Sequence, residues 1–278
     1  MKPAPFAYHR ARDVDGAVRL LAGLGDDAKA VAGGQSLVAM MNYRLARPRH
    51  LVDIARIREL DRMQRDASGG LRIGALTTHH TVERDEQALL GREFAVLRRA
   101  MEWVGHLPIR TRGTVGGSLA HADATAEWCL LALVLRAELL VRGPRGTRSV
   151  PAADFFHGYY TSDLAPDELL VEIHFPRPAP HAALTEFAER RGDFGLVVAA
   201  VDLDVVDGTV HGGRVGLGGV AAAVVRVPEA EDVLAAGGSF ADCAAAAAAA
   251  VDPPDDPAYR RHLVRTLVRR ACEEAVTA

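Results

Sequence analysis

Two glycine pairs are the residues of this chain that are best suited to bind a ligand. The first lies in residues 32–36 (Ala-Gly-Gly-Gln-Ser) and the second, about 80 residues further on, in residues 114–118 (Thr-Val-Gly-Gly-Ser). Glycine has no Cβ, so a ligand can approach the backbone N–H groups closely and the backbone can adopt positive φ. At the start of a helix such N–H groups have no partner and favour an anion. Each stretch therefore predicts a phosphate site, and the two together fit a dinucleotide better than a mononucleotide.

Other kinds of chemistry find no support in the residue pattern. A Ser-His-Asp order, paired carboxylates in a cleft and a Gly-Lys-Ser/Thr loop are all missing, which argues against a hydrolase or a nucleotidase. His106, His121 and Asp123 lack the spacing of zinc ligands, so we expect no metal site and no catalytic acid or base. A plainer interpretation also stays open, because a Gly-Gly turn is often ordinary connecting structure and Lys29 is equally consistent with an exposed side chain.

The composition is that of a soluble globular protein with room for two domains. The 278 residues are 49% hydrophobic and 25% charged, and the net charge of -3 gives no basic surface for nucleic acid or an anionic membrane. No apolar run approaches the roughly 20 residues of a membrane span, and the first residues do not resemble a signal peptide. Cys129, Cys243 and Cys272 lie far apart and suit a reducing cytoplasm, so an iron–sulfur cluster would need another chain.

The first glycine pair is expected in a small α/β unit of about 55 residues. Asp13 can cap a helix whose apolar side chains recur at helical spacing. A strand at residues 30–31 leads into the glycine turn, a helix follows to about residue 45, and residues 51–54 form another strand. This strand–helix–strand order predicts parallel strands.

The second glycine pair is expected in a larger unit that ends in a proline-rich linker. Residues 71–75 predict a strand, and Thr78 or Thr81 can cap the helix that follows. Further elements are expected as helices at 94–104 and 128–135, strands at 139–141 and 169–173, and a linker at Pro176, Pro178 and Pro180.

Beyond the linker the pattern is typical of an α+β domain. Apolar residues alternate on both sides of Asp207-Gly208, which predicts a hairpin in an antiparallel sheet. Helices are expected at residues 231–236, 241–251 and 259–276.

Short stretches along nearly the whole chain carry a resemblance to a known family. They are Ala32-Gly33-Gly34-Gln35-Ser36-Leu37, Leu51-Val52-Asp53-Ile54, Ile73-Gly74-Ala75, Ile109-Arg110, residues 112–123, Arg191-Gly192-Asp193-Phe194, residues 259–263 and residues 267–271. Each is modest alone, but their order and spacing are specific. On these stretches the chain resembles the medium, FAD-binding subunit of the molybdenum hydroxylases, the family of xanthine dehydrogenase and aerobic carbon monoxide dehydrogenase.

The resemblance implies a fold and a division into domains. A FAD-binding domain of the vanillyl-alcohol-oxidase (PCMH) type would occupy residues 1–176, with two α/β subdomains at about 1–57 and 58–176. An α+β domain like that of carbon monoxide dehydrogenase flavoproteins, with an antiparallel sheet, would follow at 181–278.

The resemblance also implies which residues bind FAD, and without a Cys or His tether we expect the binding to be non-covalent. One side of the pyrophosphate would be lined by Lys29, Ala30, Val31, Ala32, Gly33, Gly34, Gln35 and Ser36, and the other by Thr114, Val115, Gly116, Gly117 and Ser118. Asp123 and Glu127 would meet the ribose and adenosine part. Leu170 would pack on the adenine or flavin edge, and Phe194 would lie near the isoalloxazine ring.

Two residues depart from the family pattern. Ala124 stands where the family often has proline, which predicts a looser turn. Glu186 stands near a position where lysine is common close to the flavin. The family's way of tuning the flavin and the family's electron acceptor are therefore not implied for this chain.

The function implied by the resemblance is electron transfer within a larger complex. FAD would take electrons from [2Fe-2S] clusters on a small partner chain, fed by a molybdenum cofactor on a large partner chain, and would pass them to an external acceptor. The expected assembly is a dimer of heterotrimers. Two alternatives stay open: a free-standing FAD-dependent oxidoreductase of the same fold, and a binding subunit that has lost FAD and would be expected to have eroded glycine stretches.

Overall fold

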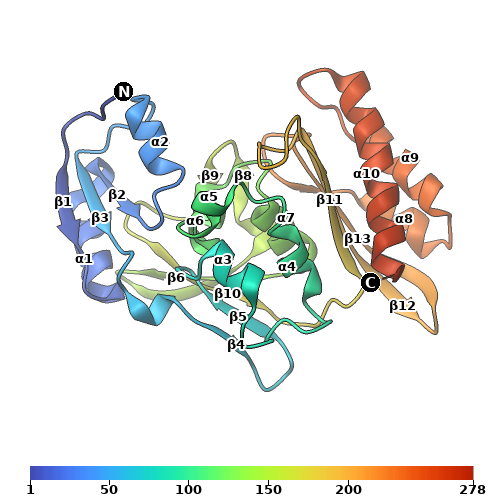
Figure 1. Cartoon of the computed structure of the whole chain (residues 1–278), viewed down its shortest axis with the longest axis horizontal. Coiled ribbons are helices and arrows are strands. Elements are labelled where there is room, and N and C mark those ends of the chain that lie inside the picture. The colour runs from blue at the N-terminus through green and yellow to red at the C-terminus, as the bar shows by residue number, and fades with distance from the viewer. Residues whose placement is uncertain (278) are drawn as a thin grey trace.

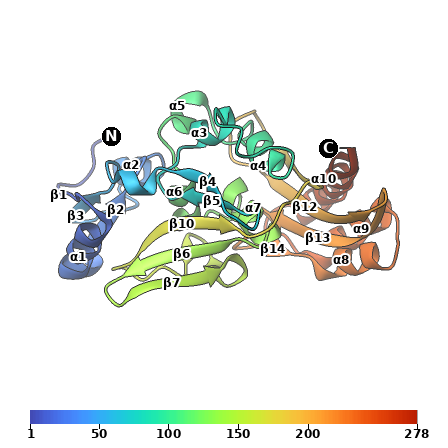
Figure 2. The same cartoon turned by 90° about the horizontal axis from the view of Figure 1, so that it is seen from below.

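The computed structural model describes residues 1–277 and shows three parts in a row, each built on its own sheet (Figure 1). The N-terminal part lies at one end of the molecule and the C-terminal part at the other. The middle part joins them, and its largest sheet lies below helices α3, α4 and α5 in the second view (Figure 2).

The N-terminal part confirms the predicted parallel α/β unit. Its elements are β1 (Ala7–Arg10), α1 (Val14–Leu24), β2 (Ala28–Val31), α2 (Leu37–Asn42) and β3 (His50–Asp53), and its parallel strands run in the order β1-β3-β2. Asp13 caps α1 as predicted, with its Oδ1 accepting a hydrogen bond from the Gly16 N–H at 2.6 Å. Strand β1 was not predicted. Helix α2 ends three residues earlier than expected, and Arg44 follows in a left-handed conformation that a helix cannot contain.

The middle part is built on an antiparallel sheet with the order β4-β5-β10-β6-β7. Its elements are β4 (Met63–Arg65), β5 (Leu71–Gly74), α3 (His79–Arg84), α4 (Ala95–Ala100), α5 (Leu107–Arg110), α6 (Val115–His121), α7 (Glu127–Val134), β6 (Glu138–Gly143), β7 (Gly146–Pro151), β8 (Phe156–Gly158), β9 (Thr161–Ser162) and β10 (Leu169–Phe175). The predicted strands at β5, β6 and β10 are confirmed, and Thr78 caps α3. The sequence missed β7, whose side chains are mostly polar and exposed, because this strand lacks an alternating apolar pattern.

The C-terminal part confirms the predicted hairpin and helices. It contains β11 (Ala182–Phe187), β12 (Val197–Val206), β13 (Thr209–Gly218), β14 (Val225–Arg226), α8 (Pro228–Ala235), α9 (Phe240–Ala250) and α10 (Pro257–Thr277). Asp207 and Gly208 both have positive φ, as a tight hairpin turn between β12 and β13 requires. The three helices cover the outer face of this antiparallel sheet (Figure 1).

Both faces of the C-terminal sheet are buried. Along β12, Val197 and Ala199 face helices α8 to α10, whereas Val198 and Ala200 belong to the core of the middle part. Helix α7 packs against this inner face and is buried at every residue from Trp128 to Val134. A helix that is apolar all round is buried all round, so α7 joins the middle and C-terminal parts in one core.

A buried histidine fixes the segment that precedes α6. The indole N–H of Trp128 donates to Nδ1 of His79 at 3.0 Å, and the His79 backbone N–H donates to the Gly113 carbonyl at 3.1 Å. Burial, together with the nearby charge of Arg110, lowers the pKa of His79 to about 4. His79 is therefore neutral at physiological pH, where its Nδ1 can accept the indole hydrogen bond.

The contact between α7 and the C-terminal sheet predicts the effect of one added methyl group. A Cβ on Gly216 would lie 2.5 Å from Cγ2 of Val134, which is fully buried. We expect Gly216→Ala to lower the free energy of unfolding by about 1–3 kcal/mol in urea denaturation. The control Gly23→Ala, whose Cβ would meet no atom within 4 Å, should be neutral or slightly stabilising. Equal stability of the two variants would contradict this packing.

The buried histidine predicts a pH dependence of stability. Its pKa falls from 6.5 in the unfolded chain to about 4 in the folded chain, so between these values the unfolded state binds the proton more readily. The contribution of His79 is fully present above about pH 6.5 and is lost as the pH falls toward 4, by up to about 3 kcal/mol. Chemical denaturation at several pH values should show a shallower loss in His79→Gln than in the wild type. Parallel curves for the two proteins would contradict the assignment.

Candidate functional site

The first glycine stretch forms a turn with unused hydrogen-bond donors. Gly34 has a φ of +74°, and the Gln35 side chain donates to the Gly33 carbonyl at 3.1 Å, which closes the turn. Among the hydrogen bonds of residues 1–277, none uses the backbone N–H groups of Gly33, Gly34, Gln35 or Ser36. Four successive backbone donors without a partner among the described residues suit an anion.

The residues just before this turn have fewer groups that could contact a ligand. Ala30 and Ala32 pack against the N-terminal core, so only their backbones can face a ligand. Lys29 and Val31 alternate with them along β2, and Lys29 is exposed with no hydrogen bond or ion pair among the described contacts. The exposed side chain remains compatible with both interpretations given above for Lys29.

The second glycine stretch differs from the prediction, because it is the first turn of α6 rather than a turn of positive φ. Thr114 caps the helix, with its Oγ1 accepting from the Gly117 N–H at 3.0 Å. Three more N–H groups are also used: those of Val115, Gly116 and Ser118 donate to the carbonyls of Thr77, Ala75 and Thr114. Within the described residues, the Thr114 N–H is the one backbone donor of this stretch without a hydrogen bond, and the hydroxyl groups of Thr114 and Ser118 can add donors.

Packing against β5 requires a glycine at position 116. A Cβ on Gly116 would lie 2.5 Å from Cβ and 2.7 Å from Cα of Ala75, at the end of β5. The absence of a side chain lets α6 approach the strand closely enough for the Gly116 N–H to reach the Ala75 carbonyl at 2.9 Å. Gly116 thus positions α6.

The two glycine stretches meet in space. A Cβ on Gly33 would overlap the carbonyl oxygen of Arg112 and lie 3.0 Å from Cα of Gly113, so the turn after β2 rests on the chain just before α6. The exposed guanidinium of Arg112 takes part in none of the hydrogen bonds or ion pairs described for residues 1–277. The structure thus adds to the free N–H groups a cation that the sequence analysis did not single out, although it lies only a few residues before the second glycine pair.

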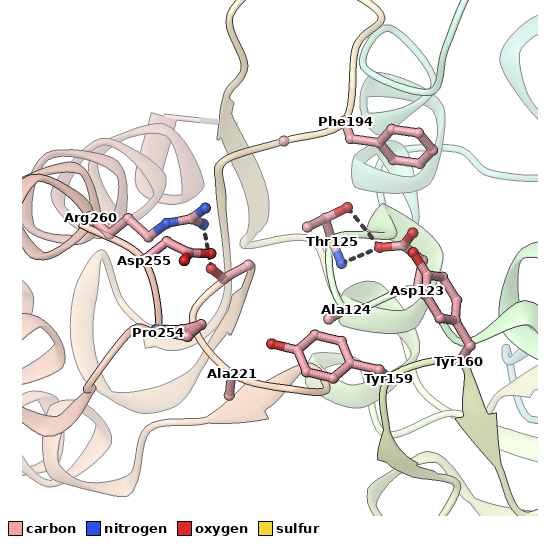
Figure 3. Close-up of a pocket in the computed structure, with 12 residues that line it drawn as sticks. Asp123, Ala124, Thr125, Tyr159, Tyr160, Phe194, Ala221, Pro254, Asp255 and Arg260 are labelled. Carbon is pink, nitrogen blue, oxygen red and sulfur yellow. Dashed lines mark hydrogen bonds between the residues drawn. The ribbon is translucent and has the colours of Figure 1, made fainter. Parts of the chain in front are cut away.

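A pocket of about 260 Å³ lies beyond the other end of α6, between the middle and C-terminal parts (Figure 3). Its lining is formed by Asp123, Ala124, Thr125, Tyr159, Tyr160, Phe194, Gly195, Gly219, Ala221, Pro254, Asp255 and Arg260. Asp123 Oδ1 accepts from both the backbone N–H and the hydroxyl of Thr125, each at 2.9 Å. The charge of Asp123, with burial and a hydrogen bond between the two side chains, raises the pKa of Tyr160.

The turn that follows Asp123 is well anchored. The Ala126 N–H donates to the Asp123 carbonyl at 3.1 Å, and the Gly219 N–H donates to the Ala124 carbonyl at 2.9 Å. On the far wall, Arg260 donates to the Gly219 carbonyl at 2.6 Å. Backbone hydrogen bonds from two parts of the molecule thus close this turn, and the loosening relative to proline stays a prediction.

The remaining predicted residues lie at different depths around the pocket. Phe194 is 78% exposed and projects from the loop between β11 and β12, on the same pocket as Asp123 (Figure 3). Glu127 is half-buried at the start of α7, where burial and the charge of Asp123 raise its pKa to about 7. Leu170 is only 5% exposed and belongs to the core of the middle part, so little of its side chain can touch a ligand.

Neither a metal site nor a membrane-spanning helix is found within residues 1–277. Within residues 1–277, no group of three or more His, Cys, Asp or Glu side chains is arranged to hold a metal ion. In the same residues, the helices are too short or too polar to span a membrane.

Comparisons with known proteins match both halves of the chain. Residues 4–178 match the FAD binding domain in molybdopterin dehydrogenase, and residues 182–275 match the CO dehydrogenase flavoprotein C-terminal domain. The chain is 39% identical over 289 residues to the 6-hydroxypseudooxynicotine dehydrogenase complex subunit alpha of Paenarthrobacter nicotinovorans, which covers 99% of this chain and 96% of that relative. It is 36% identical over 230 residues to the carbon monoxide dehydrogenase medium chain of Hydrogenophaga pseudoflava, over 81% of this chain and 78% of the relative.

Solved structures agree with these matches. A chain of the carbon monoxide dehydrogenase of Hydrogenophaga pseudoflava, in a form that lacks the Mo-pyranopterin moiety of the molybdenum cofactor, superposes with a TM-score of 0.94 at 34% identity, over 99% of this chain and 98% of that one. A chain of quinoline 2-oxidoreductase from Pseudomonas putida 86 gives a TM-score of 0.93 at 34% identity, over 100% and 99% of the two chains. With both of its domains matched, this chain belongs to the FAD-binding medium subunits of the molybdenum hydroxylases, the oxidoreductase family of xanthine dehydrogenase and carbon monoxide dehydrogenase.

Proposed function

We propose that FAD binds along α6 without a covalent bond, with its pyrophosphate at the turn of residues 33–36 and its ring in the pocket of Asp123 and Phe194. The observation that carries this proposal is the row of four free backbone N–H groups that contacts the segment leading into α6. A pyrophosphate would satisfy these donors, and Arg112 and the Ser118 hydroxyl would add charge and a further hydrogen bond.

The same geometry bears on which part of FAD meets Asp123. The seven residues of α6 span about 10 Å between the glycine turn and the pocket, roughly the distance from a phosphate to a ring in an extended dinucleotide. Because Asp123 and Phe194 line one pocket, we assign both to the ring end instead of placing Asp123 at the adenosine. Leu170 would contribute only the small edge that it leaves exposed.

We assign cofactor binding to residues 1–176, with subdomains at about 1–57 and 58–176. Residues 181–278 would supply the wall that completes the pocket for the flavin ring. Phe194 and Gly195 come from the C-terminal part, whereas Asp123 comes from the middle part, so the ring would bind where the two meet. The flavin supplies the electron chemistry, and the residues of this chain bind it, orient its ring and tune its potential.

The partners follow from the family. Relatives are named as a subunit of a dehydrogenase complex and as medium chains, which supports a large and a small partner chain for this protein. We propose that the flavin takes electrons from [2Fe-2S] clusters on the small chain, after oxidation of the substrate at a molybdenum cofactor on the large chain. The external acceptor receives them from the flavin, and the complex is a dimer of heterotrimers.

The contact between the two glycine stretches predicts the effect of one substitution on FAD binding. In Gly33→Ala the new methyl group would overlap the Arg112 carbonyl and force the free N–H groups away from α6. Loss of two hydrogen bonds to a charged phosphate costs about 3–6 kcal/mol, so we expect FAD affinity to fall more than 100-fold. Flavin released by acid precipitation measures the bound FAD, circular dichroism checks the fold, and Gly23→Ala is the control. Full flavin content in folded Gly33→Ala would refute the assignment of this turn.

The need for partner chains predicts the activity of the isolated subunit. Purified alone with FAD, the chain should not oxidise the organic substrate of the complex, although its reduced flavin should pass electrons to a dye. Co-expression with the adjacent genes should give a complex that contains molybdenum and iron, as elemental analysis would show. Substrate-dependent bleaching of the flavin in the isolated, metal-free chain would instead favour the free-standing oxidoreductase.

A further inference from the structure

Residues 188–196, the phenylalanine loop, connect β11 to β12 and present an exposed aromatic side chain to the pocket. Phe194 is 78% exposed, more than any other phenylalanine, tyrosine or tryptophan of residues 1–277, and it lines the pocket (Figure 3). Among the same residues, no aromatic ring is described in contact with it. A ring bound in the pocket would therefore remove apolar surface of Phe194 from water.

The phenylalanine loop has a defined shape. The Leu196 N–H donates to the Phe187 carbonyl at 2.8 Å, which closes the loop at its base. The Asp193 N–H donates to the Arg190 carbonyl at 3.1 Å, and between these two residues Gly192 has a φ of +88°, which L side chains rarely adopt. Phe194 thus follows directly on a tight turn that needs a glycine.

Two glycines on either side of Phe194 rest against other parts of the protein. A Cβ on Gly192 would lie 2.5 Å from Cε1 and 2.7 Å from Nδ1 of His106, the residue before α5. A Cβ on Gly195 would lie 2.9 Å from Oε1 of Glu186 on β11. The loop is therefore supported by the middle part on one side of Phe194 and by its own sheet on the other.

The segment on which Gly192 rests is itself held in place by Arg110. The Arg110 guanidinium donates to the Gly105 carbonyl at 2.9 Å and to both carboxylate oxygens of Glu83, at 3.0 and 3.1 Å. Such a bidentate pair fixes geometry as well as charge. The Gly105 carbonyl oxygen would lie 3.2 Å from a Cβ on Gly192, so the loop packs on a carbonyl that Arg110 holds.

Arg191 adds a second attachment next to the glycine. Its guanidinium pairs with the carboxylate of Glu102 at 2.8 Å and lies 5.9 Å from the centre of the Trp103 ring. Both members of the ion pair are mostly exposed, so the pair adds little to the stability of the fold. Together with the Gly192 contact, however, it leaves the phenylalanine loop one orientation on the segment of residues 102–106.

We propose that Gly192 is a positioning residue that, with His106 and Arg191, holds Phe194 ready to pack on the flavin ring. This inference rests on the proposed function. Gly192 would touch no ligand and would act only through Phe194. Because the loop is ordered when the chain folds, little conformational entropy remains to be lost when a ring binds beside Phe194.

The first test asks whether the phenylalanine loop is held when no flavin is bound. Trypsin cleaves after arginine, so cleavage after Arg190 or Arg191, located by mass spectrometry in the full-length chain, reports how often the loop opens. Gly192→Ala should make this cleavage several-fold faster, because the methyl group meets His106 and strains the turn. His106→Ala, which removes the contact and leaves the cleaved sequence unchanged, should also accelerate it.

Gly237→Ala is the matched control for backbone strain. Gly237 has a φ of +76°, and its Cβ would meet no atom within 4 Å. The substitution therefore adds a similar strain far from the pocket, and trypsin should cleave the phenylalanine loop of this variant at the wild-type rate. Wild-type cleavage rates in both Gly192→Ala and His106→Ala would overturn the proposal.

The second test asks whether Gly192 acts through Phe194 on bound FAD. Phe194→Leu should weaken FAD affinity by up to about tenfold and make the bound flavin more fluorescent, because an aromatic ring stacked on it is lost. Gly192→Ala should change both quantities in the same direction, and Gly237→Ala should change neither. The double variant Gly192→Ala/Phe194→Leu should bind FAD no more weakly than Phe194→Leu alone.

The outcomes separate the positioning role from the proposed function. Additive losses of FAD affinity in the double variant would refute the positioning role, since Gly192 would then act independently of Phe194, and would leave the proposed function intact. If Phe194→Leu keeps wild-type affinity and flavin fluorescence, the flavin ring does not lie beside Phe194. The proposed placement of the ring then fails, even where trypsin shows that the loop is held.

Discussion

The burial of residues 128–134 in α7 is the constraint on which the rest of the structure depends. Every residue from Trp128 to Val134 is buried, and a buried large apolar side chain typically stabilises the fold by about 1.5–3 kcal/mol. A helix packed on all sides cannot rotate or slide without loss of contacts on another side. Its position therefore fixes the turn of residues 123–126 before it and the inner face of the C-terminal sheet. It also fixes the hydrogen bond from Trp128 to His79, the residue that holds the segment before α6.

Helix α6 separates two kinds of polar environment. At its first turn lie unpaired N–H groups and the Arg112 guanidinium, all of which favour negative charge. Past its last turn lies the pocket lined by Asp123, whose carboxylate favours a neutral or hydrogen-donating ligand. FAD has the same division, with an anionic pyrophosphate and uncharged rings. The electrostatics of the chain thus support the proposed placement of the pyrophosphate at the first turn of α6 and of a ring beyond its last turn.

Much of the fold was predictable where local rules act alone. The cap at Asp13, the turn at Asp207 and the apolar periodicity of the long helices each depend on neighbours within a few residues. The sequence singled out the two glycine pairs as candidate sites, but it did not predict that their structural roles differ. Gly116 is required because Ala75, about 40 residues away, lies against it. Such contacts between distant elements leave no local pattern in the sequence.

The contact between Gly33 and Arg112 also has a consequence for the order of events during synthesis. The three strands of the N-terminal sheet lie within the first 53 residues, so this part can form early on the ribosome. The carbonyl on which its turn rests belongs to residue 112, and Phe194 comes later still. At about 5–20 residues per second, the nascent chain carries an incomplete binding site for several seconds. A cofactor bound at the proposed site would therefore contact segments that are synthesised at different times, the first of which can fold before the others exist.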